Sequence, residues 1–168
     1  MKKIIIFAFI CLLSLSSCDN SVNKGENDVL LHDSELIIIH EETFAKQVIN
    51  ILHGTFVENY VGRKVKVEGF YRSEDEYFSE GVFRTLLVPE GELSLPNGIT
   101  FHLQEGVYEL PLGFHVLWDG KRPNNGDWVE AIGFLEACDD ENLKVPFIML
   151  NLTSLTILDE RGLETITQ

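Results

Sequence analysis

Apolar and polar residues alternate along much of the chain after residue 62, a pattern typical of strands with one buried and one exposed face. In segment 63–71, one face carries Val65, Val67, Gly69 and Tyr71. The other face carries mainly charged residues. The segment is therefore predicted to be a strand whose first face lies in a core.

Further strands are predicted from the same pattern at Val82–Val88, Phe114–Trp118, Asp127–Ala137 and Val145–Leu158. Turn sequences at 97–98, 119–120 and 123–126 separate several of them. Five strands with these spacings predict a small closed barrel.

Two features inside these strands indicate how the barrel bends. Gly69 and Gly133 lie in mid-strand, where glycine marks a bend or a close backbone approach, and their strands are expected to be neighbours. In the last strand the apolar positions change parity near Thr153-Ser154. This change predicts a β-bulge there.

A short amphipathic helix is predicted before the barrel. Residues 36–39 form an apolar run typical of a short buried strand, and residues 41–53 follow with an apolar stripe at Phe44, Val48, Ile51 and Leu52. Glu41 and Glu42 suit the positive N-terminal end of a helix, and Gly54 is placed to end it.

Segments 60–70, 126–133 and 145–148 together resemble the OB-fold, a five-stranded barrel. They are similar to the extracytoplasmic OB-like domain of an uncharacterised bacterial family whose members accompany a permease-like membrane protein. The resemblance covers roughly Asn59–Leu158. It implies a mainly β fold, a five-stranded OB-like barrel preceded by one short helix. This chain has Leu86-Leu87 where that family often has a cysteine pair, and an insertion between Pro89 and Pro111.

The N-terminal segment resembles the signal of a bacterial lipoprotein. Two lysines, an apolar run too short to span a bilayer, and Leu15-Ser16-Ser17-Cys18 follow one another. This pattern predicts a signal peptide at 1–17, a lipidated Cys18 with a tether at 18–35, and a folded domain at 36–168 that contains the helix at 41–53. The protein is expected to be extracytoplasmic and anchored to the cell membrane or outer membrane through Cys18.

Charge narrows the choice of partners. The formal net charge is −14, and removal of residues 1–17 would take away two lysines and no acid, leaving −16. Nucleic-acid affinity comes largely from Lys and Arg side chains, so nucleic acid is not an expected partner. An integral-membrane protein is a candidate partner.

Aromatic side chains beside acids suggest a binding face. Tyr77, Tyr108 and Trp118 are flanked by Glu76, Glu109 and Asp119. Such a set suits a cationic, carbohydrate or protein partner, and these three aromatics are the predicted candidate binding face.

A metal site is the alternative. His102 and His115 are placed to meet across a hairpin, and the acidic clusters 74–76 and 139–141 offer oxygen ligands for a hard cation. The chain has no phosphate-binding glycine loop, nucleophile elbow or HExxH motif, so neither an enzyme nor a cofactor is predicted. The expected function is a lipid-anchored, non-catalytic binding or accessory module of a cell-envelope assembly such as a transporter. The alternative is an extracytoplasmic metal-ion carrier.

Overall fold

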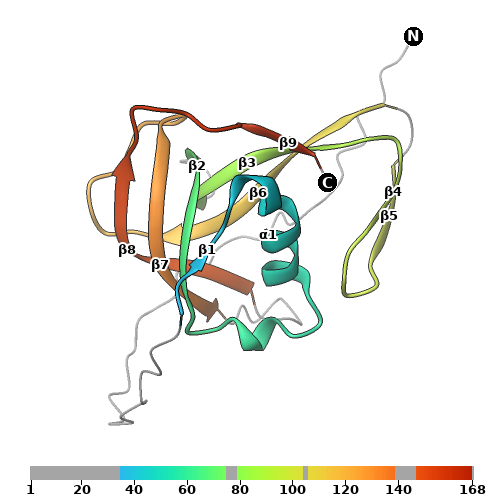
Figure 1. Cartoon of the computed structure of the whole chain (residues 1–168), viewed down its shortest axis with the longest axis horizontal. Helices are drawn as coiled ribbons and strands as arrows, with labels where there is room; N and C mark the ends of the chain where they lie inside the picture. The colour runs from blue at the N-terminus through green and yellow to red at the C-terminus, as the bar shows by residue number, and fades with distance from the viewer. Residues whose placement is uncertain (1–34, 75–78, 104–105, 139–146, 168) are drawn as a thin grey trace.

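The computed structural model describes residues 35–74, 79–103, 106–138 and 147–167, which are mainly β (Figure 1). The predicted signal peptide and nearly all of the tether lie outside these residues. The elements are, in order, β1 (Ile37–Ile38), the 3-10 turn η1 (Glu41–Thr43), α1 (Phe44–His53), the 3-10 turn η2 (Val57–Asn59), β2 (Lys64–Glu74), β3 (Ser79–Val88), β4 (Gly91–Ser94), β5 (Thr100–Leu103), β6 (Tyr108–Leu117), β7 (Trp128–Cys138), β8 (Phe147–Ile157) and β9 (Thr165–Thr167).

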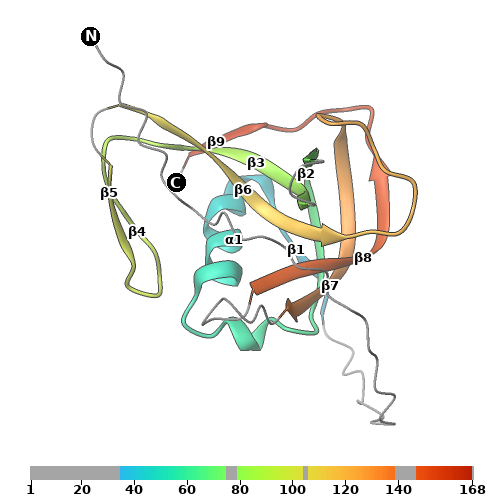
Figure 2. The ribbon, with the colours of Figure 1, turned by 180° about the vertical axis from the view of Figure 1, so that it is seen from behind.

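Five long strands close the barrel. β2 pairs with β3 on one side and with β7 on the other, β3 pairs with β6, and β7 pairs with β8, all antiparallel. A parallel pairing of β6 with β8, seen from behind in Figure 2, completes the closure. This strand order is that of an OB-like barrel, and the predicted fold class is confirmed.

The predicted bends and bulge are confirmed. β2 and β7 are neighbours, with Val65 opposite Gly133 and Gly69 opposite Val129. A Cβ atom at Gly69 would overlap the carbonyl oxygen of Phe83, so β3 crosses β2 closely at this point. Between β7 and β8 the register shifts by one residue and leaves Thr153 as the extra residue of a bulge.

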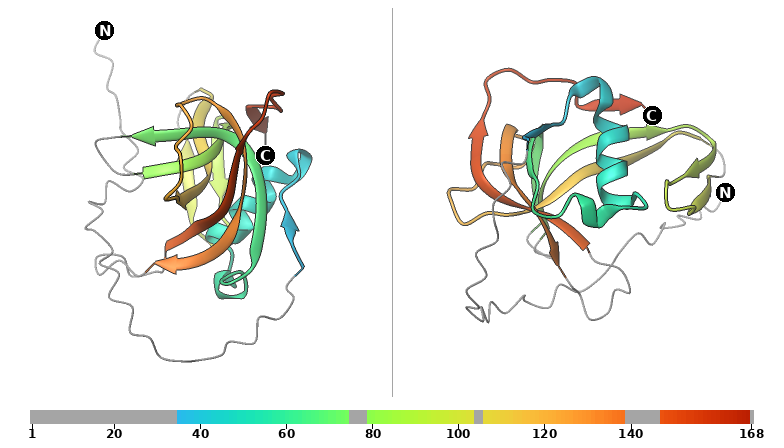
Figure 3. Two further views of the ribbon diagram at one scale, coloured as in Figure 1. Left: turned by 90° about the vertical axis from the view of Figure 1, so that its left-hand side faces the viewer. Right: turned by 60° about the horizontal axis from the view of Figure 1, so that its bottom comes forward.

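The predicted helix is confirmed, with its first turn in 3-10 form. α1 lies between β1 and the β4–β5 hairpin, and β3 and β6 cross past it (Figures 1 and 3). Phe44, Val48 and Ile51 of its apolar stripe are buried, and Leu52 is half-buried. The helix ends at Gly54, whose N–H donates to the carbonyl oxygen of Asn50 at 3.0 Å. β1 extends the sheet beside β2 and β9 extends it beside β3, both in parallel.

Three short strands were not predicted. β4 and β5 form a separate two-stranded sheet that projects beside α1, between Pro89 and Pro111 (Figure 3). β9 is three residues long and buries only Ile166. Strands this short contain too few alternations to be separated from a loop by pattern.

A buried arginine joins three distant segments at the end of the barrel covered by α1. Arg84 of β3 is 1% exposed, and its Nε donates to the carbonyl oxygen of Glu68 at 3.0 Å. Its Nη1 donates to Oε2 of Glu41 at 3.1 Å and to the carbonyl oxygen of Leu163 at 2.7 Å. The guanidinium carbon lies 5.0 Å from the ring centre of Phe44 and 4.9 Å from that of Trp128. Arg84 therefore ties β2, the helix entrance and the C-terminal segment together.

Glu41 is expected to make the stability of this junction depend on pH. The N–H of Leu163 donates to Oε2 of Glu41 at 2.9 Å, and this bond, with the hydrogen bond from Arg84, lowers the pKa of the carboxyl. A lowered pKa stabilises the fold above the ordinary carboxyl pKa, and this contribution is lost as pH falls through the folded value. Urea unfolding between about pH 7 and pH 4 should show a smaller acid-induced loss in Glu41→Gln than in the parent.

The matched control is Glu42→Gln, which changes an exposed neighbour on the same turn. Equal acid-induced losses in Glu41→Gln and in the parent would contradict a stabilising role for the ionised Glu41.

Candidate binding face

Three rings form a row across the outside of β2, β3 and β6. Phe70 is the register partner of Phe83, and their ring centres are 6.4 Å apart. The ring of His115 meets that of Phe83 edge to face at 5.4 Å. Phe83 is 7% exposed, while Phe70 and His115 are half-buried. We call Phe70, Phe83 and His115 the aromatic row.

Glycines make room for this row. His115 pairs with Gly81 across the β3–β6 ladder, and a Cβ atom at Gly81 would overlap the ring of Phe83. Gly113 pairs with Phe83, and a Cβ atom there would lie 2.7 Å from the Cα of Phe83. Gly81 therefore leaves room for the Phe83 ring to lie along the sheet, and Gly113 allows β6 to approach the backbone of β3 closely beside it.

Charge differs along the outer face of β2. Near the start of the strand, Nζ of Lys66 forms an ion pair with Glu130 and lies 3.9 Å from Oε1 of Glu68, so the charges offset one another. These acids raise the pKa of Lys66, chiefly through the hydrogen bond to Glu130. Arg72, two residues after Phe70 and the register partner of Gly81, is exposed. The aromatic row thus has a cationic residue at one side.

The loop between β6 and β7 is held against the end of β2. The side-chain amide of Asn125 accepts from the Ser73 N–H at 2.6 Å and donates to the Ser73 carbonyl oxygen at 3.0 Å. Nη2 of Arg122 lies 2.5 Å from Oε1 of Glu80, whose other oxygen accepts from the Tyr71 hydroxyl at 2.7 Å. Burial, and then the bond to Glu80, raise the pKa of Tyr71, so its hydroxyl remains a neutral donor. These contacts fix the loop at the ends of β2 and β3, on strand positions that alternate with those of the aromatic row.

The structure does not bring the predicted aromatic candidates together. Tyr77 lies outside the described residues. Tyr108 opens β6 and Trp118 follows its last residue, so about 33 Å of extended strand separates them. Both are half-buried, and the Trp118 Nε1 donates to the Lys121 carbonyl oxygen at 3.1 Å within its own turn.

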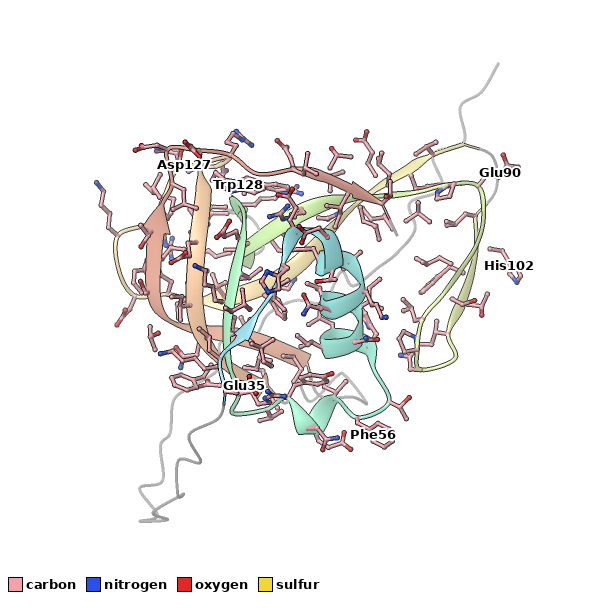
Figure 4. The ribbon with its side chains drawn as sticks, in the orientation of Figure 1. Glu35, Phe56, Glu90, His102, Asp127 and Trp128 are labelled. Carbon is pink, nitrogen blue, oxygen red and sulfur yellow. The ribbon has the colours of Figure 1, made fainter. Side chains whose placement is uncertain are left out.

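The hairpin expected to join His102 and His115 does not form. His102 belongs to β5, which pairs with β4 through the Asn97-Gly98 turn, whereas His115 lies in β6 and pairs with β3. Figure 4 shows His102 on the projecting hairpin. Within the described residues, no three His, Cys, Asp or Glu side chains group as metal ligands. The clusters 75–76 and 139–141 lie outside that part of the chain.

Two surface depressions lie away from the aromatic row. One of about 440 Å³ is lined by Leu87, Pro89, Val107 and Thr167. The other, of about 270 Å³, lies between β1, α1 and the turn before β2. None of the helices in the described ranges is long and apolar enough to span a bilayer.

Comparison of the chain with protein-family models, curated proteins and solved structures finds no match. The site must therefore be judged from its own geometry. Alternation in segment 63–71 already places Phe70 on the charged face of β2, and this was the signal in the sequence for an outward-facing ring.

Proposed function

We propose that this protein is a lipid-anchored, extracytoplasmic binding or accessory module of a cell-envelope assembly, and that it acts without catalysis. The observation that carries the proposal is the aromatic row on the outer face of the barrel. OB-like barrels commonly bind through such a face and its neighbouring loops. The sequence Leu15-Ser16-Ser17-Cys18, which resembles the lipidation signal of a bacterial lipoprotein, supports the anchor.

The chemistry of the row suits a protein or carbohydrate partner. Ring edges and faces contact apolar side chains or the C–H faces of sugars, and phenylalanine is among the residues enriched in the buried centres of protein interfaces. An integral-membrane protein of the same envelope fits an anchored module.

The experiment that tests this function places a photo-crosslinking amino acid at position 70 in the native membrane. We expect a discrete crosslinked product, because Phe70 lies at the accessible side of the row. His115→Ala should reduce that product by about tenfold or more, as expected for loss of a hot-spot contact.

The matched control places the same group at Thr156, an exposed position of β8, which is separated from β2 by β7. Crosslinks of equal yield at both positions, or a yield unaffected by His115→Ala, would count against the row as the binding face.

Nucleic acid is not expected to bind. Base stacking on rings stabilises binding by roughly 1–3 kcal/mol per base, but the chain has net charge −14 and must approach a phosphate backbone. Fluorescence anisotropy with a labelled single-stranded oligonucleotide near physiological salt should show no binding above background. Salt-sensitive binding at micromolar concentration or tighter would reverse this conclusion.

A further inference from the structure

A polar depression of about 270 Å³ lies between β1, one side of α1 and the turn that precedes β2, segments that Figure 1 shows close together. Four polar and two apolar residues line it: Gln47, Asn50, Tyr60, Arg63, Ile37 and Ile51. Ile51 is buried, and the other five are half-buried. We call this site the Arg63 depression.

Strand register places Arg63 on the inner side of the barrel wall. Its carbonyl oxygen accepts from the Leu135 N–H at 3.0 Å, and Leu135 is fully buried. Residues opposite each other in antiparallel strands share a face, so Arg63 points to the same side as Leu135. Ile37 lies on this side as well, because it pairs with the buried Val65, two residues after Arg63. The guanidinium therefore lies on the side of α1, away from the outer face that carries the aromatic row.

The polar side chains of the depression offer mainly hydrogen-bond donors. Oε1 of Gln47 accepts from the His40 N–H at 3.2 Å and from the Thr43 hydroxyl at 2.7 Å, so its Nε2 is directed elsewhere as a donor. Within the residues that the structure describes, the Arg63 guanidinium and the Asn50 side-chain amide bond to no other residue. Both groups therefore have donors available for a ligand.

The depression differs in charge from the chain as a whole, which has net charge −14. Among the described residues that line it, Arg63 alone is charged. Glu136 follows Leu135 and so alternates to the outer face, where its Oε1 accepts from the Asn151 side chain at 2.8 Å. Glu35 and Glu58 are close to the lining residues in sequence, but both are exposed and neither lines the depression. The site is therefore a local cationic one.

We propose that the Arg63 depression binds a small organic carboxylate. A guanidinium holds a carboxylate through two parallel hydrogen bonds, and the single charges of the two groups match. The Tyr60 hydroxyl and the two amides of α1 can donate to further oxygen atoms, while the two isoleucines contact a short hydrocarbon chain. A phosphate dianion fits less well, because it has a second negative charge and no apolar part. This site is independent of the lipid anchor and of the aromatic row.

The test measures the binding of radiolabelled butyrate to the purified full protein by equilibrium dialysis. The parent should bind butyrate saturably at one site. Arg63→Gln should weaken binding about tenfold or more, because the charge-assisted hydrogen bonds are lost. The matched control is Lys46→Gln, which removes the same charge from an exposed position of α1 that does not line the depression. It should change the affinity by less than about twofold, since exposed charges are screened by salt.

Competition tests the chemistry of the ligand. Unlabelled butyrate should displace the label, whereas butyramide, which has the same shape and no charge, should not. No saturable binding, equal loss in Arg63→Gln and Lys46→Gln, or equal displacement by butyramide overturns the inference. Displacement by inorganic phosphate at lower concentration than by butyrate assigns the site to phosphate and overturns the carboxylate. Asn50→Leu, which removes one donor, should also weaken binding and replaces Arg63→Gln if that variant does not fold.

Modification of arginines with phenylglyoxal, followed residue by residue by mass spectrometry, locates the site. Butyrate should slow the modification of Arg63 and leave that of Arg161, which is half-exposed, unchanged. Protection of both arginines or of neither overturns the inference. The double variant Asp139→Asn/Asp140→Asn tests carboxylates of the chain that lie outside the described residues. A gain in butyrate affinity there would show that the chain's own acids compete for Arg63, and would also overturn it.

Discussion

Replacing Arg84 with leucine is expected to lower the free energy of unfolding by about 2–5 kcal/mol, because a buried polar group that loses its hydrogen-bond partner costs roughly 1–3 kcal/mol and two carbonyl oxygens are affected. The substitution leaves the carbonyl oxygens of Glu68 and Leu163 without their donor and removes the cation from between the rings of Phe44 and Trp128. Urea or guanidinium unfolding of the parent and the variant measures this difference.

A matched control is Arg161→Ala. Arg161 also lies over the Trp128 ring, at 5.7 Å, but it is half-exposed and its ion pair with Glu164 is on the surface. A surface pair of this kind contributes at most about 1 kcal/mol. Similar losses in the two variants would show that the fold does not depend on the buried junction.

The burial of Arg84 can be predicted from the sequence, but its partners cannot. It shares a strand face with Val82, Leu86 and Val88, all of which are buried, so alternation alone places it inside. An arginine at such a position needs partners, and these come from residues 41 and 163, on either side of it in sequence. No local pattern predicts a contact between residues so far apart in sequence. The contacts of the C-terminal segment at Leu163 with Arg84 and Glu41 were not predicted for the same reason.

The barrel itself was predictable because its signals are local. Alternation gives the inner face of each strand, mid-strand glycines mark the bends, and the change of parity near Thr153 marks the bulge. Pairing partners of the short strands were not predictable. β5 pairs with β4 because the short loop 95–99 joins them, and this pairing separates His102 from His115.

The candidate binding face was predictable only in part. Phe70 falls on the charged face of β2 by alternation, but the register that sets it beside Phe83 and His115 depends on barrel closure. Acidic neighbours in sequence instead favoured Tyr108 and Trp118. These residues lie at opposite ends of β6. The prediction failed because the neighbours of a residue along its own strand do not show which residues lie on the strands beside it.

Gly133→Val is expected to destabilise the protein by about 2–4 kcal/mol, more than the roughly 1 kcal/mol that strand propensity alone spans. A Cβ atom at Gly133 would overlap the carbonyl oxygen of Asn151 and lie 2.9 Å from the Cα of Leu152. Both atoms belong to the backbone of β8 beside the bulge at Thr153, so no side-chain rotation relieves the clash.

The control is Ala137→Val, which adds a similar branched side chain at an exposed position of the same strand. It should change the free energy of unfolding by no more than about 0.5 kcal/mol, as surface substitutions usually do. Thermal or denaturant unfolding of both variants separates the contribution of strand propensity from that of the close approach. If Gly133→Val is as stable as Ala137→Val, β7 and β8 do not approach at Gly133 as described, and the bend that closes the barrel there must be assigned to other residues.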